Sequence, residues 1–262
     1  KPEEYWSIDA LLTKKEGTAA EKKPFPAKYY GKNGKKLEIK NEQQAQEILK
    51  EVTASELVIS NVKTGVRKKT PPPPFITSTL QQDASRRLGF QARRTMKVAQ
   101  ELYEGVNIEG LGAVGLITYM RTDSLRISNE AIADADHFIR TTFGDAYALS
   151  KPRVFKSKKN AQDAHEAIRP TMVELTPAKV KGNLSLDQYK LYKLIWERFV
   201  ATQMANALLD TVSVDIAAGA HLFKTSGFTV KFDGFTALYL ELNENPEDDD
   251  THLPPLKTGE GL

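Results

Sequence analysis

A tyrosine, an arginine and an aspartate alternate along one short segment, as Tyr119, Arg121 and Asp123. If this segment is extended, the three side chains project to the same side of the chain. A free tyrosine hydroxyl titrates near pH ~10, so a tyrosine that acts as a nucleophile needs a cation or a base to stabilise the developing phenolate. An arginine two residues away could do this, and its fork of donors could also hold a phosphate. The segment is a candidate for phosphoryl chemistry, with an ordinary structural tyrosine as the alternative.

A second candidate cluster lies in residues 162–170, where His165 and Arg169 are four residues apart. On a helix these two side chains would share a face, and they would offer a titratable donor and a fixed cation to one anion. The alternative is a helix end with a surface histidine. The chain has only four histidines and no cysteine. We therefore expect no metal site in the chain.

Positive charge is concentrated in two parts of the chain, and acidic charge lies at its end. Residues 61–100 hold nine bases against one acid, residues 151–170 hold six bases against two acids, and residues 241–262 hold one base against seven acids. The nine bases of the first block are Lys63, Arg67, Lys68, Lys69, Arg86, Arg87, Arg93, Arg94 and Lys97. Because nucleic-acid affinity follows local charge, the two basic blocks predict a polyanionic partner, with Arg93 and Arg94 as candidate contacts.

The elements that must position these residues are strands and helices in an order typical of an α+β fold. Period-2 patterns predict strands over 4–12, 212–216, 228–232 and 238–242, and β-branched residues predict another over 57–66. Asn33-Gly34 predicts a hairpin turn. Apolar faces and capping residues predict helices over 42–52, 77–88, 91–103, 128–143 and 186–206. We expect Thr77 or Ser78 to cap the second helix and Gly89 to end it.

The succession of β-rich, helical and β-rich segments predicts a helical domain inserted into a strand domain. The four prolines at 71–74 favour a stiff border between the two. We expect a first β-rich part at 1–76, an inserted helical domain with Tyr119 at 77–207, and a second β-rich part at 208–262. The helical pair within 77–103 also has the outline of a helix-turn-helix, with arginines at its corner.

Several classes of protein are excluded by what the sequence lacks. No run of 18 apolar residues could span a membrane, and the first residues contain no secretion signal. The absence of cysteine excludes disulfides and fits the reducing cytoplasm. The chain begins at Lys1 rather than Met and stops just after a turn, so we expect an excised fragment of a longer protein.

Four motifs occur in an order typical of one enzyme family. They are Pro-Phe-Ile-Thr-Ser-Thr-Leu-Gln-Gln (74–82), Glu-Leu-Tyr-Glu (101–104), Leu-Ile-Thr-Tyr-Met-Arg-Thr-Asp-Ser (116–124) and Ala-His-Glu-Ala-Ile-Arg-Pro-Thr (164–171). In sequence and order they resemble the type IA DNA topoisomerases, most closely the bacterial DNA topoisomerase I group. The resemblance extends weakly into both flanking β segments.

This resemblance implies a toroidal enzyme that cuts one DNA strand, passes another strand through the break and reseals it, which relaxes negative supercoils. Tyr119 matches the nucleophile that becomes joined to the 5′ phosphate, and Arg121 matches the arginine that positions the scissile phosphate. His165 matches a histidine that assists DNA binding and cleavage. Arg169 is carried over as a contact to the DNA backbone and Asp123 as a supporting residue. The β-rich parts would correspond to the arch of the torus and the helical domain to its gate.

Parts of that family's machinery have no counterpart in this sequence. The family's N-terminal toprim domain supplies a catalytic glutamate, a lysine and an acidic cluster for Mg²⁺, and its C-terminal zinc ribbons supply cysteines. The one acidic run of the chain, at 248–250, is expected to be solvated surface. We therefore expect Mg²⁺ to bind elsewhere in the full-length enzyme, and not to this chain.

The expected partners are single-stranded DNA, negatively supercoiled DNA and the toprim domain of the same polypeptide, in the bacterial cytoplasm with the nucleoid. By itself the chain is expected to bind DNA without relaxing it. Two other interpretations stay open, a non-catalytic single-stranded DNA-binding module and a structural hinge. The intact Tyr119-Met120-Arg121 motif argues against both for the parent protein.

Overall fold

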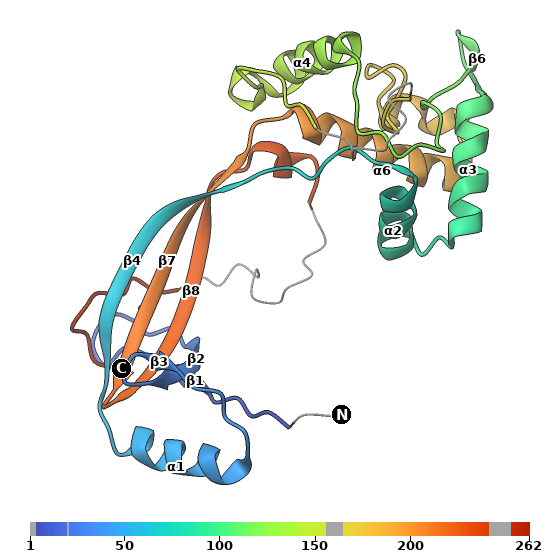
Figure 1. Ribbon diagram of the computed structural model, residues 1–262. Coiled ribbons are helices and arrows are strands. Elements are labelled where there is room, and N and C mark those ends of the chain that lie inside the picture. The colour runs from blue at the N-terminus through green and yellow to red at the C-terminus, as the bar shows by residue number, and fades with distance from the viewer. Residues whose placement is uncertain (1–3, 20, 156–164, 241–252) are drawn as a thin grey trace. The chain divides into compact units, whose positions relative to one another are not determined.

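The computed structural model describes residues 4–19, 21–155, 165–240 and 253–262 (Figure 1). These residues form two compact units. The first unit contains the described residues of 4–68, 208–231 and 253–262, and the second contains those of 69–207 and 232–240. Strands dominate the first unit and helices the second, so the α+β class expected from the sequence is confirmed.

The first unit is built on one antiparallel sheet with the strand order β1-β2-β8-β7-β4, in which β3 also pairs with β2. Its strands are β1 (Asp9–Leu12), β2 (Phe25–Lys32), β3 (Lys35–Lys36), β4 (Leu57–Lys69), β7 (Ala207–Ala218) and β8 (His221–Phe232). The predicted hairpin turn is confirmed between β2 and β3, where Asn33 and Gly34 have φ values of 55° and 74°. Two successive positive φ values are what a two-residue type I′ turn requires.

Helix α1 (Glu42–Thr53) contributes to the core of the first unit. Asn41 accepts a hydrogen bond from the backbone N–H of Gln44, which fixes the start of the helix as predicted. The helix buries Ala45, Ile48 and Val52, which lie at the helical spacing of three and four residues. These side chains belong to the same apolar cluster as residues from β2, β4, β7 and β8.

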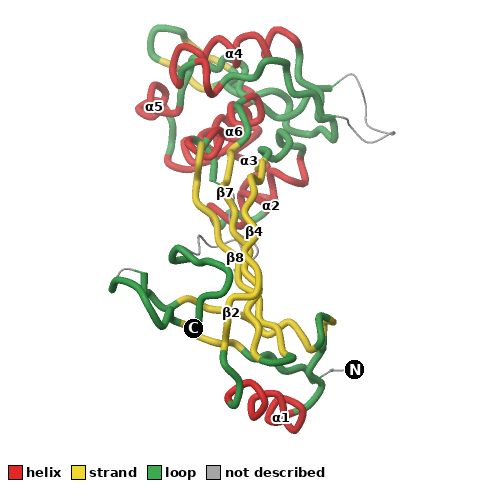
Figure 2. The backbone as a smooth tube through the Cα atoms, turned by 90° about the vertical axis from the view of Figure 1, so that its left-hand side faces the viewer, coloured by secondary structure: helices red, strands yellow, loops and turns green. Residues whose placement is uncertain are grey.

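The second unit is a group of helices arranged around α6 (Leu186–Gln203), as the red segments of Figure 2 show. The other helices are α2 (Thr77–Leu88), α3 (Ala92–Glu104), α4 (Asn129–Phe143) and the short α5 (Pro177–Val180), and each of them contacts α6. A small hairpin of β5 (Val106–Ile108) and β6 (Gly112–Val114) follows α3. Helix α6 is buried along most of its length, because the other helices pack around it. At its start, Ser185 and Gln188 form the predicted capping box.

The end of β8 corrects one part of the predicted organisation. Residues 238–240 are not a strand, and a short 3-10 helix, Gly234–Ala237, precedes them. Phe235 and Tyr239 are buried among the helices. Residues 232–240 therefore belong to the helical unit and not to a second β-rich part that begins at 208. The predicted strand residues do not form one buried face, because Leu238 packs against the helical core whereas Leu240 is exposed.

Candidate active site

The segment that carries Tyr119 is held by backbone hydrogen bonds on both sides. At its start, the N–H of Leu116 donates to the carbonyl oxygen of Leu102 near the end of α3, at 2.8 Å. Further along, the N–H of Thr118 donates to the carbonyl oxygen of Arg169 at 2.9 Å. Tyr119 thus follows a stretch of backbone that is fixed to two other parts of the helical unit.

Burial alternates along the segment. Met120, Thr122 and Ser124 are buried, with at most 7% of each residue exposed. Tyr119, Arg121 and Asp123 are exposed, and 38% of Tyr119 is accessible to solvent. The three polar side chains therefore lie on the accessible side, as the sequence spacing predicted, with a bend in the backbone at Met120 and Arg121.

Thr77 anchors the next part of the segment to the first turn of α2. The N–H of Thr122 donates a hydrogen bond to the Thr77 hydroxyl oxygen at 2.9 Å. The hydroxyl in turn donates to the carbonyl oxygen of Met120 at 2.8 Å. The prediction that Thr77 or Ser78 caps α2 is wrong, because Ile76 occupies the position before the helix. Instead, the Thr77 hydroxyl binds the backbone of the tyrosine segment.

The prediction that His165 and Arg169 share a helical face is also wrong. This segment is extended: the N–H of Ile168 donates to the carbonyl oxygen of Phe75 at 2.8 Å, and Thr118 pairs with the carbonyl oxygen of Arg169. Backbone groups that pair with neighbouring segments on both sides are unavailable for the hydrogen bonds of a helix. The residue pattern alone contained no sign of these two long-range partners.

The two predicted residues of this segment are placed in different surroundings. The side chain of Arg169 is only 13% exposed, and it donates to the Glu166 carboxylate at 2.6 Å and to the Pro170 carbonyl oxygen at 2.9 Å. Its donors are therefore committed inside the protein. His165, by contrast, lies against Tyr119, with 5.8 Å between the two ring centroids.

Tyr119 contacts a second ring on the side of α3. The ring of Tyr103 meets it edge to face, at 5.4 Å between centroids and an interplanar angle of 66°. Tyr103, Tyr119 and His165 therefore form a row of three rings with Tyr119 in the middle. Sequence reasoning did not name Tyr103 as a site residue, although it lies within the Glu-Leu-Tyr-Glu motif.

A hollow of about 360 Å³ opens beside this row. It is lined by Ile76, Thr77, Ser78, Arg121, Thr122, Asp123 and His165. A guanidinium, an imidazole and the N-terminus of a 12-residue helix meet here, opposed by one carboxylate. Within the described residues, Arg121 makes no hydrogen bond or ion pair. Since helix N-termini and arginines both favour anions, the hollow suits a phosphate group.

Comparison with known proteins identifies the family. The model of the DNA topoisomerase family matches residues 1–262. This chain belongs to the type IA DNA topoisomerases. It is also similar to the structure of full-length topoisomerase I from Thermotoga maritima, with a TM-score of 0.76 and 32% identity. That match covers 99% of this chain and 39% of the other, so the topoisomerase chain spans about two fifths of the length of this relative.

The remaining predicted DNA contacts of the topoisomerase chain differ in how available they are. Arg94 donates twice to the Asp187 carboxylate, at 2.8 Å for each bond, and its guanidinium also lies over the ring of Phe90. Arg93 is exposed and has no such partner among the residues that the structure describes. Within those described ranges, Arg93 is therefore more available to DNA than Arg94.

A site for Mg²⁺ was looked for among the residues that the structure describes. In the described ranges, no three histidine, aspartate or glutamate side chains gather closely enough to hold a metal ion. The acidic run at 248–250 lies outside those ranges. In the same ranges, no helix of the topoisomerase chain is both long and apolar enough to cross a membrane.

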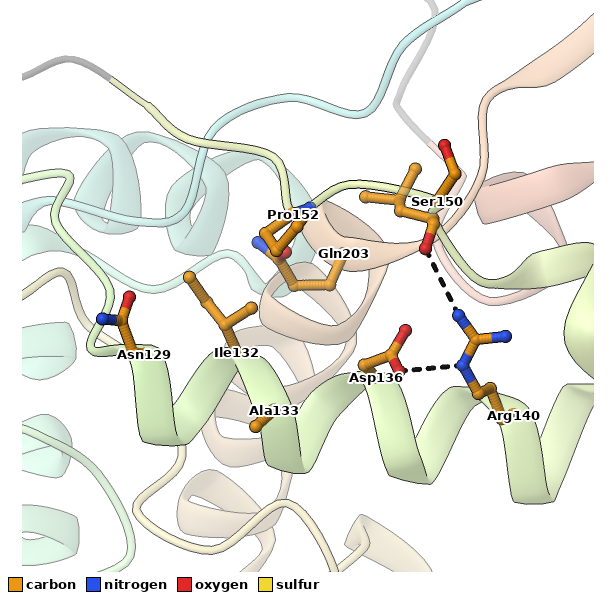
Figure 3. Close-up of a pocket in the computed structure, with 9 residues that line it drawn as sticks. Asn129, Ile132, Ala133, Asp136, Arg140, Ser150, Pro152 and Gln203 are labelled. Atoms are coloured by element: carbon orange, nitrogen blue, oxygen red, sulfur yellow. Dashed lines mark hydrogen bonds and ion pairs between the residues drawn. The ribbon is translucent and has the colours of Figure 1, made fainter.

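A second hollow, of about 380 Å³, runs along α4 (Figure 3). None of the residues singled out in the sequence lines it. Its charged groups are already paired, because Arg140 donates to Asp136 at 2.8 Å and to the carbonyl oxygen of Leu149 at 3.3 Å. The rest of the lining includes Ile132, Pro152 and the buried Gln203. The hollow beside Tyr119 is therefore the candidate site that we consider further.

Proposed function

We propose that this chain is the tyrosine-bearing gate portion of a type IA topoisomerase that relaxes negatively supercoiled DNA. The enzyme would cleave one strand, pass another strand through the break and reseal it. The observation that carries the proposal is an exposed tyrosine, Tyr119, next to a hollow that is lined by Arg121, Asp123 and His165.

In the proposed reaction, the hydroxyl oxygen of Tyr119 attacks the phosphorus of a DNA phosphodiester. A bond forms between the tyrosine oxygen and phosphorus, and the bond from phosphorus to the 3′ oxygen breaks. The phenol loses its proton and the leaving 3′ oxygen gains one. Because one phosphodiester replaces another, the energy of the broken bond is conserved, and attack by the 3′ hydroxyl reverses the step without ATP.

The side chains around Tyr119 are assigned roles that fit their surroundings. Arg121, which has no partner in the described structure, would hold the scissile phosphate and offset its developing charge. His165 would contact both the phosphate and the Tyr119 ring, and Asp123, which also lines the hollow, would support the site. Arg169 is more suited to positioning its own segment through Glu166 than to binding DNA directly.

Mg²⁺ and the proton for the leaving oxygen belong, in this proposal, to a toprim domain of the same polypeptide. No step in this chain is assigned to the metal, since the described residues do not fit it. The substrates would be single-stranded and negatively supercoiled DNA, in the bacterial cytoplasm with the nucleoid. We expect the 262-residue chain alone to bind DNA without relaxing a supercoiled plasmid.

The test is a Tyr119→Phe variant of the full-length enzyme that contains this chain, incubated with end-labelled single-stranded DNA. The unsubstituted enzyme should form a DNA adduct that survives denaturation, and the variant should form none while it binds DNA with similar affinity. Tyr5→Phe is the matched control, because Tyr5 is a highly exposed tyrosine of the other unit and its loss should leave the adduct intact. Residual adduct in Tyr119→Phe would refute the assignment.

The alternative is a module that binds single-stranded DNA without cutting it. The exposed Arg93, which has no partner among the described residues, favours DNA binding outside the hollow. Both functions predict salt-sensitive binding by the isolated chain, with log affinity falling against log salt by about 0.7 for each phosphate neutralised on a single strand. Only the enzyme predicts the adduct. Binding that is independent of salt would contradict both.

A further inference from the structure

We propose that Tyr103 is a positioning residue for Tyr119, and that its ring holds the ring of the nucleophile in place for attack. The inference rests on the proposed function of Tyr119. Its basis is the edge-to-face contact between the two rings, at 5.4 Å and 66°, on the side of Tyr119 where α3 ends. Aromatic pairs favour this geometry because the positive edge of one ring meets the negative face of the other.

The backbone beneath the two rings sets their spacing. Tyr103 is the second-last residue of α3, and the residue before it, Leu102, accepts the backbone hydrogen bond from Leu116. A Cβ atom added at Gly115 would lie only 2.7 Å from the carbonyl oxygen of Tyr103. The tyrosine segment therefore passes the end of α3 as closely as the absence of a side chain allows, and both rings project from backbone that is fixed.

A nucleophile that is 38% exposed needs such support. A solvent-exposed tyrosine side chain samples several staggered rotamers, and only an oxygen held in line with the phosphorus is productive. Tyr103 and His165 contact the Tyr119 ring, which confines it to the orientation seen here. Small losses of orientation lower rates strongly, because the reacting atoms must stay within about 3–3.5 Å of each other.

The ring of Tyr103, and not its hydroxyl, carries this role. In the part of the chain that the structure describes, the hydroxyl makes no hydrogen bond, and 40% of the residue is exposed to solvent. A phenylalanine at this position should therefore support Tyr119 as well as the tyrosine does. A side chain without a ring should not.

Base stacking is the competing role, since exposed aromatic rings also stack against the bases of single-stranded nucleic acid. The two roles predict different kinetics. A stacking residue acts on DNA affinity, whereas a positioning residue acts on the rate of adduct formation after DNA has bound.

The experiment compares Tyr103→Phe and Tyr103→Leu in the full-length enzyme that contains this chain. The first measurement is the single-turnover rate of adduct formation on labelled single-stranded DNA at saturating enzyme. The second is the dissociation constant for the same DNA, measured in a Tyr119→Phe background where no adduct forms. We expect Tyr103→Phe to stay within about twofold of the unsubstituted rate and Tyr103→Leu to lose about tenfold, with both dissociation constants unchanged within about twofold.

Two controls separate the outcomes. Tyr5→Leu, at a highly exposed tyrosine of the other unit, should leave the rate unchanged, and Tyr103→Gln gives a second ringless variant if Tyr103→Leu does not fold. An unchanged rate of adduct formation in the ringless variant overturns the positioning role. A rise in the DNA dissociation constant that accounts for the whole loss of rate overturns it as well. If the unsubstituted enzyme forms no adduct at all, the proposed function itself is wrong.

Discussion

Thr77 and Thr122 exchange hydrogen bonds in both directions. The N–H of Thr77 donates to the carbonyl oxygen of Thr122 at 3.0 Å, and the N–H of Thr122 donates to the Thr77 hydroxyl at 2.9 Å. This pair joins the first turn of α2 to the segment that presents Arg121. The Thr77 hydroxyl therefore contributes one of the two hydrogen bonds that join these residues at the wall of the candidate phosphate hollow.

Replacement of Thr77 by valine should destabilise the chain by about 1–3 kcal/mol, because the Thr122 N–H loses its acceptor in a buried position. Thr77→Ser keeps the hydroxyl and should cost much less. Equilibrium denaturation with urea measures both changes. Equal stability of the valine and serine variants would show that the hydroxyl contributes nothing.

Gly115→Ala should also destabilise the chain, by about 1–3 kcal/mol, because its new Cβ would meet the carbonyl oxygen of Tyr103 at 2.7 Å and force the backbone apart. Gly182→Ala is the matched control, since nothing lies within 4 Å of a Cβ built there and its backbone is not in the left-handed region. Thermal melts of the two variants provide the comparison. If both melt alike, the close approach at Gly115 is not a constraint.

Arg121→Ala should lower the rate of adduct formation about a hundredfold, since loss of one cation beside a developing charge costs about 3 kcal/mol. Arg140→Ala is the control, because Arg140 is engaged with Asp136 and Asp145 and lines the other hollow. The rate is measured in the full-length enzyme that contains this chain. A near-normal rate in Arg121→Ala would assign the phosphate to another group.

Glu51 should make the stability of the chain depend on pH in the acidic range. Hydrogen bonds from Lys32 and then from His221 lower the pKa of its carboxyl below the usual value of 4.5. A lowered folded-state pKa stabilises the fold above the unfolded pKa, and this contribution disappears as the pH falls through the folded pKa. Glu51→Gln should therefore be less stable than the unsubstituted chain at pH 7. The two chains should become equally stable once the Glu51 carboxyl is protonated in both the folded and the unfolded state.

The measurement for Glu51 is the free energy of unfolding of both chains from pH 7 downward. Glu38→Gln is the control, because Glu38 is exposed and has no partner among the residues that are described. The role of the carboxylate would be contradicted if Glu51→Gln and the unsubstituted chain differed in stability by the same amount down to the lowest pH.

The sequence by itself determined the features that depend on neighbouring residues. The N-cap at Asn41, the capping box at Ser185, the turn at Asn33-Gly34 and the αL residue Gly89 are decided by local backbone preferences. The alternation of Tyr119, Arg121 and Asp123 is local in the same sense, because successive side chains of extended backbone point to opposite sides.

Only the tertiary structure decided which of these residues meet. The 165–170 segment has a helical spacing, yet its backbone pairs with Phe75 and Thr118 and is extended. That pairing brings His165 to Tyr119, and the close pass at Gly115 brings Tyr103 to the same ring. Residues 232–240 likewise belong to the helical unit, where Phe235 and Tyr239 are buried. In each case the deciding partner lies far away in the chain, and the free energy of long-range pairing and burial outweighs the weak local preference.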